Sequence, residues 1–176
     1  LEEIPVAGGT AAIEPSLDYI VAKFPRFPFD KFADADNSLS TQMKATGEVM
    51  SIGRTFEESL LKGIRSLEIG LYHLEHPKFE SMSEETLLDY IKIGTDDRIY
   101  AIAQLLRLGC SAEKISLASG IDRFFICKLR NIVLMEPEIK SRRGDTDMLY
   151  TAKKAGFSDR ELAKLWDMTE NDVFSL

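Results

Sequence analysis

The chain of 176 residues is 44% hydrophobic and 29% charged, which is the composition of a folded globular protein and not of a disordered one. Its formal net charge of −7 argues against nucleic-acid or anionic-membrane binding as the main role, because both need clustered positive charge. The two cysteines are too few for a disulfide scaffold and no apolar run is long enough to span a bilayer, so we expect reduced thiols and a cytoplasmic location.

The first 40 residues predict loop and strand, because Pro15, Pro25 and Pro28 prevent a long helix there. Residues 17–24 are largely apolar on both faces of an extended segment, which predicts a strand buried on both sides. A group of closely spaced aromatic residues follows, and its members are Phe24, Phe27, Phe29 and Phe32. We interpret this group as a hydrophobic seam that packs against another part of a larger protein, in preference to a base-stacking platform.

Residues 48–52 alternate polar and apolar side chains between Gly47 and Gly53, which is typical of a half-buried strand. The two glycines are also spaced as in a phosphate-binding loop. However, Arg54 and Thr55 follow where such a loop needs lysine and then serine or threonine to hold the phosphates and magnesium. We therefore predict a structural segment here and no nucleotide site.

A well-marked helix is predicted over residues 55–69. Thr55 is a good N-cap, and Glu58 three residues later completes the pattern of a capping box. Leucine and isoleucine then recur at helical spacing and give the helix one apolar face. We expect Gly70 to end this helix in the left-handed conformation.

The remainder of the sequence is almost entirely helical. The predicted helix starts are Ser83, Asp96, Ser111, Asp122, Asp145 or Thr146, Ser158 and Thr169. Gly94 is expected to end the helix after Ser83, and Pro137 predicts a connector. Ser158 with Glu161 and Thr169 with Asp172 read as further capping boxes.

A short internal echo links two of these helix junctions. Gly109-Cys-Ser-Ala-Glu-Lys-Ile and Gly156-Phe-Ser-Asp-Arg-Glu-Leu share a glycine, an apolar residue, a serine cap and a later apolar residue. Each predicts a longer helix, a tight glycine turn and a short helix. The fold class that we predict is mainly α: a bundle of about seven to eight helices in two sub-bundles, with a short N-terminal β segment.

A metal site is suggested by His73 and His76, which stand near Glu75 and Glu80. Zinc needs three or four ligands in fixed geometry, and Pro77 predicts a loop over these residues. We therefore interpret both histidines as surface residues of a loop. The cysteines form no CxxC motif, so we expect neither metal nor redox chemistry from them.

A DNA-binding regulator is the alternative function, because residues 161–176 resemble a helix-turn-helix. The segment that would read DNA, residues 169–176, carries Glu170 and Asp172 and no lysine or arginine. Residues 145–176 contain four basic and seven acidic side chains. Because phosphate contacts supply most DNA affinity, the charge argues against this alternative.

Three blocks of the sequence occur in one order that is familiar from a known family. They are Glu14-Pro-Ser-Leu-Asp-Tyr-Ile-Val-Ala-Lys-Phe-Pro-Arg-Phe27, Met-Lys-Ala-Thr-Gly-Glu-Val-Met-Ser-Ile-Gly-Arg-Thr at residues 43–55, and Gly120-Ile-Asp-Arg-Phe-Phe125. Together they resemble the large chain of carbamoyl-phosphate synthase. Because the chain begins at Leu1 without a methionine, we expect it to be a piece of a longer protein.

The resemblance implies that residues 1–53 are the tail of the first, carboxyphosphate-synthetic ATP-grasp unit and residues 54–176 the helical oligomerisation domain. The parent would be a ligase that makes carbamoyl phosphate from bicarbonate, glutamine-derived ammonia and ATP, for pyrimidine or arginine synthesis. It would use ATP with Mg²⁺ or Mn²⁺, and K⁺ as a further ion. Its magnesium-binding carboxylates and asparagine would precede Leu1, so we expect the fragment to hold no cofactor, metal or catalytic residue and to be inactive.

The resemblance also implies partners and a position for the N-terminal residues. The partners are the rest of the large chain, a glutaminase small subunit and further copies of the chain. The net charge, as above, predicts no nucleic acid and no membrane as partners. Glu14, Ser16 and Leu17 would lie near the wall of an internal tunnel, although Leu17 also suits an ordinary core strand. Lys44 and Glu48 would lie near the nucleotide cleft, although an ion pair at the domain junction explains both more simply.

Overall fold

The computed structural model of the chain describes residues 3–4, 9–10, 17–29, 31–32 and 34–176. Its strands form two antiparallel pairs, in which β1 pairs with β2 and β3 with β4. The strands are β1 (Glu3–Ile4), β2 (Gly9–Thr10), β3 (Ile20–Arg26) and β4 (Gly47–Gly53).

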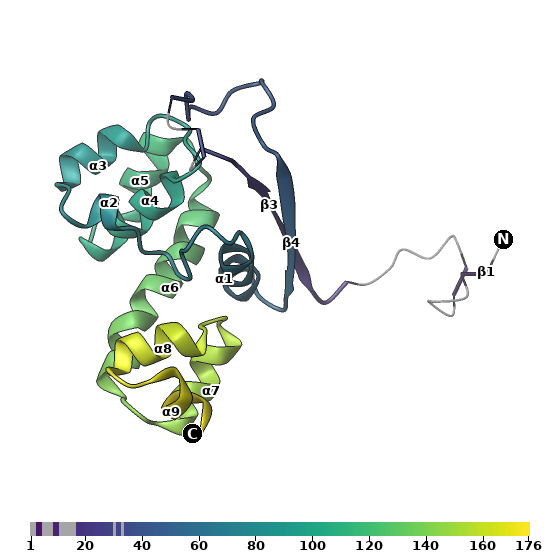
Figure 1. Ribbon diagram of the computed structural model, residues 1–176, viewed down its shortest axis with the longest axis vertical. Helices are drawn as coiled ribbons and strands as arrows, with labels where there is room; N and C mark the ends of the chain where they lie inside the picture. Colours follow the sequence, from purple (N-terminus) through teal and green to yellow (C-terminus); the bar gives the residue numbers. More distant parts are fainter. Residues whose placement is uncertain (1–2, 5–8, 11–16, 30, 33) are drawn as a thin grey trace.

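The described residues are otherwise mainly helical, as predicted. The helices are α1 (Phe56–Ser66), α2 (Pro77–Glu80), α3 (Glu84–Tyr90), α4 (Arg98–Arg107), α5 (Ala112–Ser119), α6 (Arg123–Ser141), α7 (Thr146–Lys154), α8 (Asp159–Trp166) and α9 (Glu170–Phe174). Helices α2 to α5 gather at one end of α6 and form what we call the first lobe, whereas α7 to α9 gather at its other end and form the second lobe (Figure 1). The two lobes correspond to the two predicted sub-bundles.

The hairpin of β3 and β4 is held to the helices through α1. A Cβ atom placed on Gly63 of α1 would lie 2.2 Å from the ring of Phe24, so the missing side chain makes the space that this ring occupies. The Ser51 hydroxyl donates to the Ser59 carbonyl at 2.7 Å, and the Ser59 hydroxyl donates to the Ser51 carbonyl at 3.2 Å. These reciprocal bonds satisfy both buried hydroxyls and fix β4 against α1.

The prediction that the strand at residues 17–24 is buried on both sides is wrong for this chain. Val21 is 46% exposed and its neighbour across the hairpin, Ile52, is 51% exposed. The α1 helix covers one face of this two-stranded sheet, and no described element covers the other. An apolar composition on both faces therefore did not produce burial on both faces.

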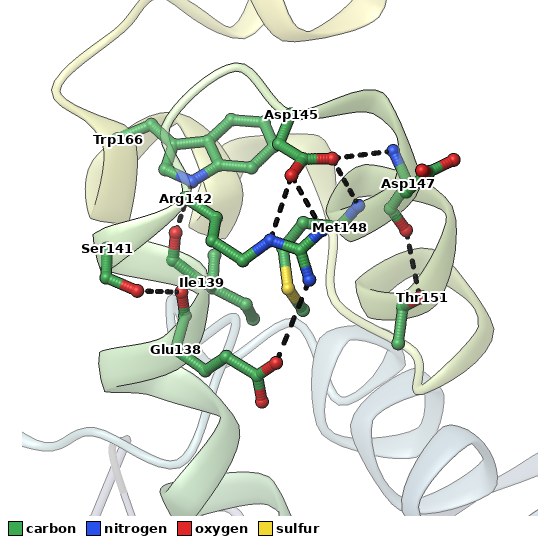
Figure 2. Close-up of polar contacts among 9 residues, drawn as sticks. All are labelled: Glu138, Ile139, Ser141, Arg142, Asp145, Asp147, Met148, Thr151 and Trp166. Carbon is green, nitrogen blue, oxygen red and sulfur yellow. Dashed lines mark hydrogen bonds and ion pairs between the residues drawn. The ribbon is translucent and has the colours of Figure 1, made fainter.

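Helix α6 connects the two lobes and continues through Pro137, where the sequence predicted a connector. Proline lacks a backbone N–H and costs a helix one hydrogen bond, yet packing on both sides retains the helix to Ser141. At this end the Trp166 indole N–H of α8 donates to the Ile139 carbonyl at 2.6 Å, as Figure 2 shows. A residue of the second lobe thus adds a hydrogen bond to one of the last carbonyls of α6, which also accepts the Arg142 N–H at 3.0 Å.

The turn from α6 into α7 is organised by Asp145, the N-cap of α7 (Figure 2). Its carboxylate accepts the backbone N–H groups of Asp147 and Met148 at 2.9 and 3.1 Å. The Arg142 guanidinium donates to the same carboxylate at 2.6 Å, so both charges at this turn are compensated. These contacts satisfy the first free N–H groups of α7.

The echo between the two helix junctions is confirmed as a repeated structure. Gly109 follows α4 with φ of +85° and Gly156 follows α7 with φ of +98°, a region that favours glycine. In both turns the N–H of the residue after glycine donates at 3.0 Å to a carbonyl five residues earlier. Ser111 and Ser158 then cap α5 and α8.

Several predicted helix ends need correction. Helix α1 ends at Ser66 instead of Gly70, because Glu68 already takes the left-handed conformation with φ of +53°. Helix α3 ends at Tyr90 and not at Gly94. The capping box at Thr169 is complete, but the Glu58 carboxylate accepts from the Arg54 N–H instead of the Thr55 N–H, so that box is only half formed.

Candidate functional site

The outer face of the hairpin presents a row of apolar side chains. Tyr19 precedes β3, and Val21 of β3 pairs in register with Ile52 of β4, next to the pair of Lys23 with Met50. All four apolar members of this row are exposed in the chain. A two-stranded sheet with one apolar face open is marginal by itself, which indicates a surface that contacts another part of a protein.

The structure separates the two polar residues that the sequence placed near a cleft. The Lys44 ammonium donates to the carbonyls of Asp36 and Ser38 at 2.8 and 2.6 Å and lies 3.2 Å from the Asp36 carboxylate. Glu48 instead pairs with Lys23 at 2.7 Å. The predicted ion pair between Lys44 and Glu48 is therefore wrong, because nearer partners hold each of them.

Asp36 has an unusual environment for an exposed carboxylate. The Ser38 hydroxyl and backbone N–H donate to it at 2.7 and 2.9 Å, and the Lys44 ammonium contacts it as well. These hydrogen bonds, with that of the Ser38 hydroxyl the strongest, lower the pKa of Asp36 to about 2. The loop before β4 is thus held by an ionised carboxylate.

Of the three residues predicted near a tunnel wall, Leu17 is 65% exposed. Its interpretation as an ordinary core residue is therefore wrong for this chain. Glu14 and Ser16 lie outside the described residues. A tunnel-wall role stays a prediction for all three.

The predicted aromatic seam is only partly formed. Phe24 packs on α1, and the rings of Phe27 and Phe29 stack with centroids 5.5 Å apart. Phe32 is 62% exposed. Phe27 and Phe29 are half-buried, so Phe32 is the exposed member of this group.

A groove of about 770 Å³ lies between α3 and α5 on the first lobe. Its apolar part is formed by Leu88, Leu117 and Ala118, and Leu117 is 89% exposed. Charged side chains of both signs surround this part, and they are Glu84, Glu85, Asp89, Lys92 and Lys114. An apolar centre with a charged rim is the arrangement of a protein–protein interface.

A second polar site lies where the lobes meet and includes residues that the sequence did not single out. The Arg107 guanidinium at the end of α4 donates to both Glu136 carboxylate oxygens of α6, at 2.9 and 2.7 Å. His73 Nε2 contacts Glu136 at 3.0 Å and must donate, since the carboxylate only accepts. Burial alone would raise the pKa of Glu136, but the Arg107 and His73 hydrogen bonds lower it below its ordinary value.

Residues 67–76, which connect α1 to α2, also contact the second lobe. The Arg160 guanidinium stacks on the Tyr72 ring at 3.9 Å, and Lys164 pairs with Glu75. The His73 ring packs on Phe157, which follows the repeated glycine turn, with centroids 4.9 Å apart. We call this group, with Arg107, Glu136 and Glu161, the interlobe cluster.

Glu161 of α8 is the residue of the interlobe cluster whose carboxylate forms neither a hydrogen bond nor an ion pair with the described residues. Its side chain is buried, and Oε1 has no hydrogen-bond partner among the described residues. The backbone N–H of Glu161 donates to the Ser158 hydroxyl at 3.2 Å, but no hydrogen bond from the Ser158 N–H to the Glu161 carboxylate is formed. The predicted capping box between Ser158 and Glu161 is therefore wrong in its second half.

The histidine prediction is also corrected. His73 is 3% exposed and is a buried member of the interlobe cluster, and His76 caps α2, a helix within the predicted loop. Within the part of the chain that the structure describes, no group of three histidine, cysteine, aspartate or glutamate side chains could hold a metal ion. Residues 47–53 form a regular strand and not a phosphate loop.

The helix-turn-helix resemblance is real in shape, because α8 and α9 are joined by a tight turn at Asp167. Helix α9 has only five residues and two acidic side chains in its first turn.

None of the helices among the described residues is both long and apolar enough to cross a membrane.

Sequence reasoning missed Arg107, Glu136 and Glu161 as a group. Each is a charged residue in a helix that would ordinarily face solvent. The available signal was weak: Glu161 lies one residue before the apolar Leu162 and takes part in a serine-cap pattern. Only the tertiary contact between the lobes brings the three together.

A comparison with protein-family models matches residues 48–176 to the carbamoyl-phosphate synthetase large chain, oligomerisation domain. The match begins within β4 and covers all the helices of both lobes. It agrees with the mainly helical fold. The chain therefore belongs to the carbamoyl-phosphate synthetase large-chain family and carries its oligomerisation domain.

Proposed function

We propose that the chain is a linking and self-association module of a carbamoyl-phosphate synthase large chain. In this proposal the parent ligase makes carbamoyl phosphate from bicarbonate, glutamine-derived ammonia and ATP, with Mg²⁺ or Mn²⁺ and K⁺. It does so in the cytoplasm, for pyrimidine or arginine synthesis. The family match over residues 48–176 supports the proposal.

The N-terminal residues are proposed to belong to a catalytic neighbour. We assign residues 1–53 to the end of an ATP-grasp unit and residues 54–176 to the helical domain. The open apolar face of the hairpin, with Val21, Met50 and Ile52, supports this division because it needs a partner surface. That partner is the rest of the large chain, and a glutaminase subunit completes the parent complex.

Self-association is proposed to use the groove between α3 and α5. A twofold interface brings the same patch of both copies together, so the patch must complement itself. This groove meets that requirement, since it offers the exposed Leu117 at its centre and charges of both signs at its rim. In two facing copies, Lys92 of each can meet an acidic residue of the other. The groove with Leu117 is the observation that carries the proposal.

Replacing Leu117 by glutamate is expected to abolish self-association. A charge at the centre of an apolar contact loses the hydrophobic contribution and adds like-charge repulsion between copies. Sedimentation velocity over rising protein concentration measures the result. The wild-type chain should shift to faster species and Leu117→Glu should stay monomeric.

The matched control is Leu134→Glu on α6, where the leucine is 61% exposed but lies outside the groove. It should associate as the wild type does. A wild-type chain that stays monomeric at high concentration, or equal loss in both variants, would contradict the assignment of this groove.

The isolated chain is expected to turn over no ATP. We propose that the reacting groups of the parent lie outside the chain. Release of inorganic phosphate from ATP with bicarbonate and ammonium, measured with Mg²⁺ present, is the direct test. Turnover above the level of a buffer blank would overturn the claim that this module has no active site of its own.

A further inference from the structure

The interlobe cluster contains as many arginine and lysine side chains as carboxylates, besides His73. They are Arg107, Arg160 and Lys164 against Glu75, Glu136 and Glu161. Glu161 faces His73 and Glu75 from residues 67–76, Glu136 from α6, Lys164 from its own helix and the Arg107 charge from α4. Arg107 forms an ion pair with Glu136, and Lys164 forms one with Glu75. Both cations are thus engaged by other carboxylates. No cation among the described residues forms an ion pair with Glu161, and no donor reaches its Oε1.

The side chains that border the cavity beside Glu161 supply no hydrogen bond to its Oε1. It has a volume of about 270 Å³ and is bordered by further charged groups, namely Glu75, Glu80, Arg160 and Lys164. Arg160 stacks on Tyr72, and Glu80 is exposed. A buried carboxylate without a partner is costly when ionised, whereas a protonated one is neutral. A proton on Glu161 removes the charge that no neighbouring group pairs with.

We propose that Glu161 is a proton-controlled latch between the two lobes: the neutral, protonated side chain can stay buried where α8 meets residues 67–76 and α6, and its ionisation places an unpaired charge there that loosens this contact. The proposal concerns the position of the second lobe and is independent of the groove on the first lobe. It assigns to this domain a response to pH that does not require any active-site group.

The direction of the pH effect follows from the pKa of Glu161. Burial raises this pKa above its ordinary value of 4.5; His73 and Lys164 oppose the shift, and Glu75 and Glu136 add to it. A raised folded-state pKa means that the contribution to stability is complete below about pH 4.5 and is lost as the pH rises through the folded-state pKa. Glu136 has a lowered pKa and acts in the opposite sense, so acid destabilises through it.

Glu161→Gln isolates the contribution of Glu161 to the pH dependence of stability, because glutamine has nearly the same shape and cannot ionise. Thermal unfolding of the wild type and the variant is measured from pH 4 to pH 8. The midpoint of the variant minus that of the wild type should increase by at least about 3 °C across this range. The change with pH is the informative quantity, since any fixed cost of the buried amide cancels from it.

Glu80→Gln is the matched control, because Glu80 borders the same cavity but is exposed. Its difference from the wild type should stay constant with pH. The fluorescence of Trp166, the one tryptophan of the sequence, reports locally on the contact of α8 with α6. Its emission should move to longer wavelength as the wild type is taken from pH 4 to pH 8 and should stay fixed in Glu161→Gln.

A carbon-13 carboxyl titration, with the Glu161 signal assigned from Glu161→Gln, locates the proton. Titration of Glu161 above the range of the exposed glutamates supports the latch. Titration in the ordinary range, or a Trp166 shift that is the same in both proteins, would overturn it. An unfolding difference that is constant with pH would overturn it as well.

Discussion

Replacing Arg107 by methionine is expected to lower the free energy of unfolding by about 3–5 kcal/mol at pH 7. Methionine retains much of the apolar length of the side chain but removes the guanidinium that donates twice to Glu136. It also removes the bond from Arg107 to the Leu74 carbonyl at 2.8 Å. Glu136 would then be buried with His73 as its remaining partner. Urea unfolding followed by circular dichroism measures the loss.

Two further variants separate this explanation from a general loss of packing. Arg107→Met combined with Glu136→Met removes both charges and should recover most of the stability, because Glu136 is then no longer a buried carboxylate without its arginine. Arg142→Met breaks the exposed ion pair with Asp145 and should cost no more than about 1 kcal/mol. A single Arg107→Met cost below that of Arg142→Met would contradict the burial argument.

Replacing Gly156 by alanine is expected to cost about 3 kcal/mol of unfolding free energy. Gly156 has φ of +98°, where an L side chain is strained. An added Cβ would also lie 2.8 Å from the Cα atom of Glu58 in α1, and backbone cannot move aside as a side chain can. The Gly156 carbonyl accepts from Arg65 at 2.6 Å, so the same substitution disturbs a second link between α1 and the second lobe.

The repeated turn supplies its own control for this prediction. Gly109 has nearly the same conformation, with φ of +85°, but an added Cβ there would meet nothing within 4 Å. Gly109→Ala should therefore cost only the conformational strain, about 1 kcal/mol. Equal midpoints in urea unfolding for the two alanine variants would show that the contact with α1 contributes nothing.

The helices were predictable because their start signals are local. Side chains at Ser83, Ser111 and Ser158 accept the expected N–H groups, since a cap depends on residues only three positions apart. Pro137 was misleading for the opposite reason. Its effect depends on whether packing from both lobes outweighs one lost hydrogen bond, and that packing comes from distant residues.

The candidate site was less predictable than the fold. The pairing of Glu48 with Lys23 follows from the strand register, which the pattern of residues 48–52 does not specify. His73 stood in a segment with a proline and two charged neighbours, which is typical of surface loops. It is buried because the second lobe covers it, a contact between residues far apart in the chain.

The continuity of α6 has a consequence for how this domain can vary. One helix of 19 residues carries a lobe at each end, so its length sets both the spacing and the angle between them. Each inserted residue would advance one end by about 1.5 Å and turn it by about 100°. The indole of Trp166 would then miss its carbonyl and residues 67–76 would face the wrong side of α8. Length changes are therefore geometrically allowed in the connecting loops and forbidden in this helix.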